Sequence, residues 1–468
     1  MPKKKKVSKL DKLRYKRVSA WKGLSKKEID KIFKYAEGYK IYLDKGKTER
    51  ESVIYSIKLA KKHGFTDKLS KTKDKLILSN KGKAVAIIYK GRKSILDGFK
   101  LVAAHVDAPR LDLKANPLYE DEDLALLKTH YYGGIKKYHW VNRPLAMHGV
   151  IFLRGGKKLE ISIGEDISDP IFVISDLLPH LAYKVQGTKK ISEAITGEKL
   201  NIITGSIPVS DEEKDAIKLH ILKILNEKYG FEEEDFLSSE IEIVPVSKAR
   251  DVGFDRGLVG AYGHDDRICS YTAITSVFNL KSKPEYTAIA LLIDKEEVGS
   301  EGNTSAQSRW LIEILGDLIK LEGKEPTEYR TTKLLAKSYC LSADVAAGIN
   351  PDYKEVHEKR NAPRMGYGIT LVKFTGSRGK GGSSDANAEL VSYIREIFNK
   401  AKVKWQVGEL GKVDEGGGGT IAKYISNLGV ETIDCGTPVL GMHSPLELAS
   451  KVDLYETYKG YSAFFKAK

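Results

Sequence analysis

Strand-like and helix-like segments alternate along most of the chain, and this alternation most strongly limits the folds open to it. The stretches "KAVAIIYKG", "FKLVAAHVDAPRL", "YTAIALLID", "SYCLSAD" and "GYGITLVKFTG" have the apolar character of strands. The stretches "SAQSRWLIEILGDLIKLEG" and "NAELVSYIREIFNKAK" repeat apolar residues at helical spacing. "KAVAIIYKG" is almost continuously apolar, as strands buried on both faces are. We therefore predict an α/β fold, a mixed sheet flanked by helices.

The stretch from residue 113 to 246 interrupts this alternation. Short alternating segments such as "GVIFLRGG" and "KLEISIG", with glycine pairs at 133–134 and 155–156, are typical of hairpins. The sequence therefore predicts an inserted β-rich domain. Its expected bounds are 113–246, between a first α/β part at 1–112 and a second α/β part at 247–468.

Three further helices are expected around this sheet. Residues 20–64 have helical spacing throughout, and a helix is expected over 211–229. The stretch "SPLELASKVDLYETYKGYSAFF" has the N-terminal pattern of a capped helix. There Ser444 would be the N-cap, Pro445 the first helical residue, and Glu447 the partner of Ser444 in a capping box.

The formal net charge of +15 raises the question of a nucleic-acid partner. Lysines distributed over the whole chain supply most of the excess, and their densest run, "MPKKKK", has the character of a solvated tail. No RNP motif, helix-turn-helix signature or Cys/His finger accompanies the charge. We therefore expect no nucleic-acid partner.

We also expect no attachment of the chain to a membrane. No apolar run reaches the length of a membrane-spanning helix, and the N-terminus lacks the apolar core of a signal peptide. The three cysteines, at 269, 340 and 435, are far apart and form no CxxC pair. Sparse cysteines argue against a disulfide scaffold and favour a reducing cytoplasm.

Ionisable side chains follow each predicted strand, at the edge of the sheet where α/β proteins collect function. Taken singly, each has an ordinary explanation, such as a hydrogen-bonded histidine or an aspartate that caps a turn. Together they offer nitrogen and oxygen ligands without a thiolate, which suits Zn²⁺, Mn²⁺ or Co²⁺ in a catalytic site. Their number exceeds the needs of one tetrahedral zinc and matches two ions about 3.5–4 Å apart that share a carboxylate. The candidates are His105, Asp107, His264, Asp265, Asp266, Glu296, Glu297, Asp344 and His443.

Two of these carboxylates, Glu296 and Glu297, are adjacent in "DKEEVGSEG". Successive side chains of a regular strand point to opposite faces, so both can reach one cavity only where the strand ends. We expect that end at Val298-Gly299.

The chain resembles the aspartyl aminopeptidase family of zinc metallo-aminopeptidases, which includes the vacuolar aminopeptidase I type. Matching stretches occur in family order from about residue 101 to 450. They are "AAHVDAPRLDLK", "NRPLAMHG", "LLPHLA", "GHDDR", "DKEEVGSEG", "SADVAAG", "GSRGKGGSSDANAE", "KVDEGGGGTIA" and "GMHSPLELAS". The resemblance implies a zinc-peptidase domain with cocatalytic metals, an inserted domain used for dimerisation, and a dodecamer built from dimers.

The resemblance also implies a role for each ligand candidate. One ion would be held by His105 and Asp344, and the other by Glu297 and His443. The remaining roles are a bridging carboxylate for Asp265, general base for Glu296, and orientation of the His105 ring for Asp107. The bridging segment reads "GHDDR" where other family branches have an Asp-Asn pair, so Asp266 stays an alternative to Asp265.

Three further residues are candidates for contact with substrate. His180 in "LLPHLA" matches a histidine that reaches substrate from the inserted domain, in its own or a neighbouring subunit; a structural histidine beside a proline turn is the alternative. Arg378 and Lys380 lie in a glycine-rich loop that could meet an acidic side chain or a carboxylate, or carry ordinary surface cations. The "VDEGGGGT" loop lacks the Lys-Ser/Thr of a phosphate-binding loop, so its glycines favour close approach to substrate or a tight turn.

The expected function is a cytoplasmic, homo-oligomeric metallo-aminopeptidase. It would remove N-terminal residues, preferably Asp or Glu, from peptides by means of a water activated by two divalent ions, with zinc expected and manganese or cobalt as alternatives. A related dipeptidase, carboxypeptidase or deacetylase, an aminopeptidase for neutral residues, and a non-enzymatic scaffold are the competing hypotheses.

Overall fold

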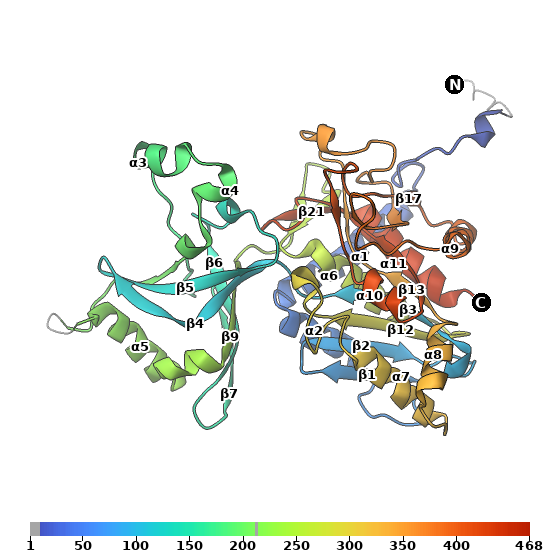
Figure 1. Cartoon of the computed structure of the whole chain (residues 1–468), viewed down its shortest axis with the longest axis horizontal. Coiled ribbons are helices and arrows are strands. Elements are labelled where there is room, and N and C mark those ends of the chain that lie inside the picture. The colour runs from blue at the N-terminus through green and yellow to red at the C-terminus, as the bar shows by residue number, and fades with distance from the viewer. Residues whose placement is uncertain (1–9, 211–213) are drawn as a thin grey trace.

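The computed structural model describes residues 10–210 and 214–468 and consists of a body and an arm that lie side by side (Figure 1). The arm is defined here as residues 110–245, from the first to the last strand of its sheet, and the body is the rest of the described chain. The "MPKKKK" run and the first three residues of the helix expected over 211–229 lie outside the described residues.

An eight-stranded mixed sheet forms the centre of the body, which confirms the expected α/β class. Its order is β1-β2-β12-β3-β13-β19-β15-β17. Neighbours from β12 to β19 run parallel, whereas β2 lies antiparallel to β12 and β15 lies antiparallel to β19. The strands are β1 (Lys75–Asn80), β2 (Ala84–Tyr89), β3 (Phe99–His105), β12 (Thr287–Ile293), β13 (Tyr339–Ser342), β15 (Ile369–Val372), β17 (Trp405–Val407) and β19 (Glu431–Gly436).

Helices cover both faces of this sheet. Alternate residues of β3 enter different apolar cores: Val102 and Ala104 pack in one, and Leu101 and Ala103 in the other. β3 and β12 are buried along their whole length, as their continuous apolar sequence indicates. The first core includes side chains of α1 (Lys26–Lys45), α2 (Glu49–Lys62), α6 (His264–Phe278), α9 (Ala388–Lys400) and α11 (Lys451–Lys466). The second includes side chains of α7 (Trp310–Leu321), α8 (Glu328–Leu335) and α10 (Ala422–Asn427).

The helical stretch expected at 20–64 is divided in two. α1 ends before Gly46, and α2 begins after Thr48. Each helix begins with a capping box, Ser25 with Glu28 and Thr48 with Glu51, which satisfies two backbone N–H groups at the start of each helix.

A five-stranded sheet packs beside the central one, and it overturns one prediction. Its order is β10-β11-β21-β20-β14. Residues 447–450, expected in the first turn of the last helix, form β21 instead, and α11 begins at Lys451. The capping box at Ser444 and Glu447 is therefore wrong, because β21 pairs with two strands and Glu447 is buried. The strands are β10 (Arg250–Val252), β11 (Leu258–Ala261), β14 (Ala346–Ala347), β20 (Pro438–Leu440) and β21 (Glu447–Ser450).

The arm has its own six-stranded antiparallel sheet, in the order β7-β6-β9-β4-β5-β8. Its apolar core contains Leu111, Trp140 and Ile243, and α5 (Ala216–Tyr229) packs on β4, β5 and β8. Two short helices, α3 (Pro179–Ala182) and α4 (Ile191–Ala194), lie at the top of the arm in Figure 1. The strands are β4 (Arg110–Asp121), β5 (Leu124–Tyr132), β6 (Leu145–Phe152), β7 (Lys158–Ile163), β8 (Ile202–Gly205) and β9 (Ser239–Pro245).

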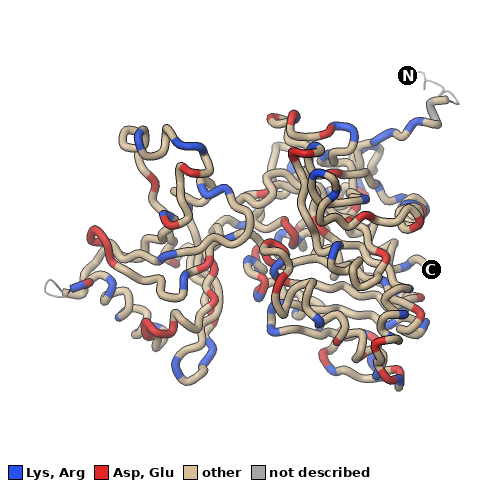
Figure 2. Tube along the Cα trace, viewed as in Figure 1, with Lys and Arg blue, Asp and Glu red and all other residues tan. Residues whose placement is uncertain are grey.

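Basic and acidic residues are interspersed along the traces of both body and arm (Figure 2). This distribution fits the expectation that the positive net charge reflects dispersed lysines. Among the helices of the described chain, none combines the length and apolar character that crossing a bilayer requires.

Candidate metal centre

The ligand candidates come from the ends of five strands in two different sheets. In the central sheet, His105 ends β3, the glutamates 296 and 297 follow β12, and Asp344 follows β13. The other two candidates follow strands of the five-stranded sheet: Asp265 after β11 and His443 after β20. The centre therefore lies where the two sheets meet.

Two groups of possible ligands share Asp265. In the first, His105 Nε2 lies 3.1 Å from Asp265 Oδ1 and 4.0 Å from Asp344 Oδ1. In the second, His443 Nε2 lies 3.3 Å from Asp265 Oδ2 and 3.5 Å from Glu297 Oε2. Within each group the ligand atoms lie within 4.8 Å of one another, close enough to hold a metal ion.

The structure separates the two adjacent aspartates of "GHDDR". The two oxygens of Asp265 face the two histidines of the centre. Asp266 turns away: its Oδ2 accepts a hydrogen bond from the backbone N–H of His105 at 3.3 Å. The preceding His264 is also structural, because its ring bonds Tyr39 and the carbonyl of Val259. The geometry thus puts Asp265, and not Asp266, between the two groups.

Several buried atoms of this centre have no hydrogen-bond partner among the described residues. They include His105 Nε2, Asp265 Oδ1 and Glu297 Oε1. Buried polar atoms in native proteins normally have a hydrogen-bond partner, so these three atoms indicate a site for a ligand. Imidazole nitrogen and carboxylate oxygen are ligands that zinc accepts. The residues present therefore fit divalent metal ions.

Burial also sets the electrostatics of the cluster. It raises the pKa of Glu296 to about 7 and the pKa of Glu297 and Asp344 well above the usual range of a carboxyl group. Burial acts in the same direction on Asp265, but the adjacent rings of His105 and His443 outweigh it and hold the pKa of Asp265 below its usual range. So many buried carboxylates in one place favour the binding of cations.

The adjacent glutamates lie on a turn rather than at the end of a strand. β12 ends at Ile293, so the expected end at Val298-Gly299 is wrong. Residues 296–298 form a short 3-10 helix, flanked by Lys295 at φ 68° and Gly299 at φ 91°. On this turn adjacent side chains no longer face opposite ways, and both glutamates line the same cavity.

Asp107 holds this turn and the first histidine together. Its carboxylate accepts hydrogen bonds from the backbone N–H groups of Glu296 and Glu297, at 3.2 and 3.1 Å. The Nδ1 of His105 lies 3.1 Å from the carbonyl oxygen of Asp107 and 3.3 Å from its Oδ1. With Nδ1 engaged in this way, Nε2 faces Asp265 and is free to bind a metal.

Glu447, which the sequence placed in a helix cap, supports the other side of the centre. Its side chain is 1% exposed and accepts hydrogen bonds from the backbone N–H groups of His443, at 2.8 Å, and Asp265, at 3.0 Å. His443 has a φ of 65°, which side-chain-bearing residues rarely adopt, so its backbone needs support of this kind. A single buried carboxylate therefore fixes one residue from each of two separate loops.

We expect Glu447→Gln to weaken metal binding about 10–100-fold, as the loss of such outer partners typically does. The amide retains one acceptor oxygen, but its NH₂ group would face one of the two N–H donors. Titration of metal-free protein with Zn²⁺ measures the affinity, and Glu389→Gln, an exposed position on α9, is the control. An unchanged affinity of Glu447→Gln would contradict the supporting role.

A cavity of about 630 Å³ opens beside the centre. Glu296, Glu297, Asp344, Asp265 and His443 line one side of it. The other side is formed by the two glycine-rich loops singled out in the sequence, which pair with each other through β16 (Gly376–Ser377) and β18 (Gly417–Gly418). The glycines thus make backbone part of the wall of the cavity.

Asp434 on β19 anchors this wall, a role that was not predicted from the sequence. It accepts hydrogen bonds from Ser384 of the first loop at 3.1 Å and from Thr420 of the second at 2.7 Å. A third hydroxyl, that of Ser342 on β13, donates to it at 2.7 Å. Serine and threonine side chains in both loops are the feature that could have suggested a shared acceptor.

The three substrate candidates lie in different places. Arg378 and Lys380 line the cavity, and Lys380 Nζ also pairs with Asp385 at 2.7 Å. His180 lies on α3 of the arm, is exposed, and is not among the described residues that line the cavity of its own chain.

Comparison with known proteins agrees with these features. A family model described as Aminopeptidase I zinc metalloprotease (M18) matches residues 42–465. A probable M18 family aminopeptidase 1 of Borrelia garinii is 49% identical over 456 residues, covering 96% of this chain and 100% of the relative.

Solved structures share the fold. An M18 aminopeptidase of Thermotoga maritima has a TM-score of 0.92 at 46% identity, covering 97% of this chain and 100% of its own. A more distant structure, the S. cerevisiae mApe1 dodecamer, has a TM-score of 0.75 at 20% identity, covering 93% of this chain and 97% of its own. These matches confirm the family that the sequence motifs indicated. The chain therefore belongs to the M18 family of aminopeptidase I zinc metalloproteases and is a metallo-aminopeptidase.

Proposed function

We propose that this enzyme removes N-terminal acidic residues from peptides with two divalent metal ions, preferably zinc, in each chain. The observation that carries the proposal is the pair of ligand groups that share Asp265, one with His105 and Asp344 and the other with His443 and Glu297. Two ions bound there would polarise the scissile carbonyl and lower the pKa of water.

The chain's own residues have distinct tasks in this proposal. Glu296 lines the cavity and belongs to neither group that shares Asp265, although it lies within ligand distance of His105 and Glu297. In this proposal its carboxylate takes a proton from water and passes it to the leaving amine. Asp107 positions Glu296 through the backbone hydrogen bond to its N–H. The carboxylates around the cavity can also receive the free α-amino group of the substrate, which favours attack on N-terminal residues.

The charge of the cavity wall supports the acidic preference. Beyond the metal cluster, the wall carries the cations Arg378, Lys380, Lys412 and Lys423. Arg378 lies on the exposed loop and makes no ion pair with another described residue, so its guanidinium remains available. A guanidinium can bind the carboxylate of an Asp or Glu side chain in a two-pronged, charge-assisted contact.

The proposal is tested with anilides of Asp, Glu and Leu, each with a free and an acetylated amino group. We expect cleavage of the free forms alone, with Asp and Glu ahead of Leu. Arg378→Ala should lower kcat/KM for Asp and Glu about 10-fold or more, the size of one lost charge-assisted bond, and leave Leu unchanged. Arg395→Ala, an exposed arginine on α9, is the control. A Leu preference would contradict the acidic specificity, and cleavage of acetylated substrates would contradict the aminopeptidase reaction.

The arm, by the same proposal, is the dimerisation domain of a homo-oligomer; the related S. cerevisiae mApe1 is a dodecamer. The support in this chain is apolar surface: Leu181, Tyr183 and Ile191 are 64%, 72% and 69% exposed. Monomeric proteins seldom leave so much apolar surface uncovered in one segment. His180 lies within this surface, which agrees with a role in the cavity of a neighbouring subunit.

A further inference from the structure

The end of β5 is the part of the arm that reaches the metal centre. We infer that residues 132–134 are a positioning element of the arm that holds two proposed ligands of one ion, Glu297 through Tyr132 and His443 through Gly134. The inference rests on the proposed metal site and adds to it a dependence on the arm.

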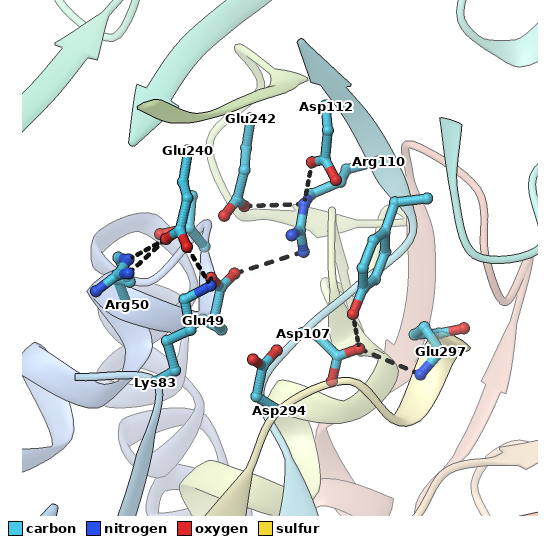
Figure 3. Close-up of polar contacts among 12 residues, drawn as sticks. Glu49, Arg50, Lys83, Asp107, Arg110, Asp112, Glu240, Glu242, Asp294 and Glu297 are labelled. Carbon is cyan, nitrogen blue, oxygen red and sulfur yellow. Dashed lines mark hydrogen bonds and ion pairs between the residues drawn. The ribbon is translucent and has the colours of Figure 1, made fainter. Parts of the chain in front are cut away.

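Tyr132 acts on Glu297 through Asp107. Its hydroxyl donates a hydrogen bond to Asp107 Oδ2 at 2.8 Å. The same oxygen accepts the backbone N–H of Glu297 at 3.1 Å, a contact drawn in Figure 3. Since Oδ1 of Asp107 accepts the N–H of Glu296, the hydroxyl of one arm residue fixes the carboxylate that holds the whole turn.

Gly134 acts directly on His443. Its carbonyl oxygen lies 2.9 Å from Nδ1 of His443, which donates the hydrogen bond. A neutral imidazole that donates from Nδ1 presents an unprotonated Nε2, and here Nε2 faces Asp265 and Glu297. The arm therefore selects the ring nitrogen of His443 that can bind a metal.

Gly133, between these two residues, fits closely against the turn, where a Cβ would make tight contacts. It has a φ of 72°, and a Cβ added there would lie 3.3 Å from Cβ of Glu297 and 3.4 Å from the ring of Pro109. Close approach of this backbone to Glu297 thus depends on glycine.

A buried ion network fixes the position of Tyr132 relative to the body. The Arg110 guanidinium lies over the Tyr132 ring, 4.0 Å from its centroid. Arg110 on β4 pairs with Glu242 of the arm at 3.2 Å and with Glu49 of the body at 3.4 Å, as Figure 3 shows. All three charged side chains are nearly inaccessible to solvent. Movement of the arm would have to break this buried network before Tyr132 could leave Asp107.

Tyr132→Phe tests the first contact, because it removes one hydroxyl and leaves the ring under Arg110. We expect Zn²⁺ titration of metal-free protein to show an affinity about 10-fold or more weaker, within the usual range for lost outer partners. We also expect kcat to fall with little change in KM, since the cavity wall is untouched. The control is Tyr131→Phe, the same change at the adjacent exposed residue, whose ring points elsewhere.

Gly133→Ala tests the close approach, and Gly155→Ala is its matched control. Both glycines belong to the arm and have positive φ, 72° and 89°, but only at Gly155 does an added Cβ meet nothing within 4 Å. Gly133→Ala should weaken Zn²⁺ binding, whereas Gly155→Ala should lower only the melting temperature.

The outcomes distinguish failure of the positioning element from failure of the proposed metal site. Wild-type affinity for Zn²⁺ in both Tyr132→Phe and Gly133→Ala would overturn the positioning element and leave the metal site intact. Failure of the wild-type protein to bind Zn²⁺ would overturn the proposed function itself.

Discussion

Glu296→Gln is expected to lower kcat about 10²–10⁴-fold while the protein keeps its full complement of metal, the range attributed to a lost general base. The amide has the shape of the carboxylate but does not take up a proton near neutral pH. Its backbone N–H still bonds Asp107, so the turn and its neighbour Glu297 should remain in place. Steady-state kinetics on an Asp anilide, combined with metal analysis of the same sample, measure both quantities.

Glu301→Gln is the matched control for this variant. Glu301 is an exposed carboxylate a few residues along the same segment, and it is not among the residues that line the cavity. The control should retain wild-type activity. Turnover of Glu296→Gln close to that of the wild type would remove Glu296 from the role of base.

The second large effect is expected on metal stoichiometry. Because Asp265 faces both histidines, Asp265→Ala should lose both ions and all measurable activity. Asp344→Ala touches only the group with His105, so it should retain the ion held by Asp265, Glu297 and His443. Metal analysis after dialysis should therefore give two ions per chain in the wild type, one in Asp344→Ala and none in Asp265→Ala.

Chelation of the wild-type enzyme is the companion experiment. Activity should disappear with the metal and return when Zn²⁺, Mn²⁺ or Co²⁺ is added. Asp266→Asn separates the role of Asp266 from that of Asp265. Within this centre, the Asp266 side chain accepts only the backbone N–H of His105. Two ions retained by Asp265→Ala would contradict the shared carboxylate.

The sequence predicted the central sheet well because the composition of its strands is enough to identify them. β3 and β12 are buried on both faces, so continuous apolar runs sufficed to find them. The ligand candidates followed from the same logic, since they lie where strands end. The lining of the cavity was also foreseeable in part, from the glycines of two loops.

Contacts between distant segments were not predictable in the same way. The start of the last helix was placed at Ser444 because Ser-Pro-x-Glu is a strong local pattern. In the structure Glu447 instead accepts N–H groups from Asp265 and His443, and β21 pairs on both sides. A local pattern cannot reveal which strands will pair with residues 447–450, or which distant N–H groups will bond the Glu447 carboxylate. The roles of Tyr132 and Asp434 escaped the sequence for the same reason.

The ligand groups draw on residues scattered from His105 to His443, and β21, which supports them, lies between a strand from mid-chain and one that directly precedes it. In the order of synthesis, the histidine at 443 and the carboxylate at 447 follow every other residue of the two ligand groups. A growing chain therefore lacks a complete centre until these two residues have been made. Peptide-bond cleavage is in this way withheld from a nascent polypeptide that has not yet reached residue 443.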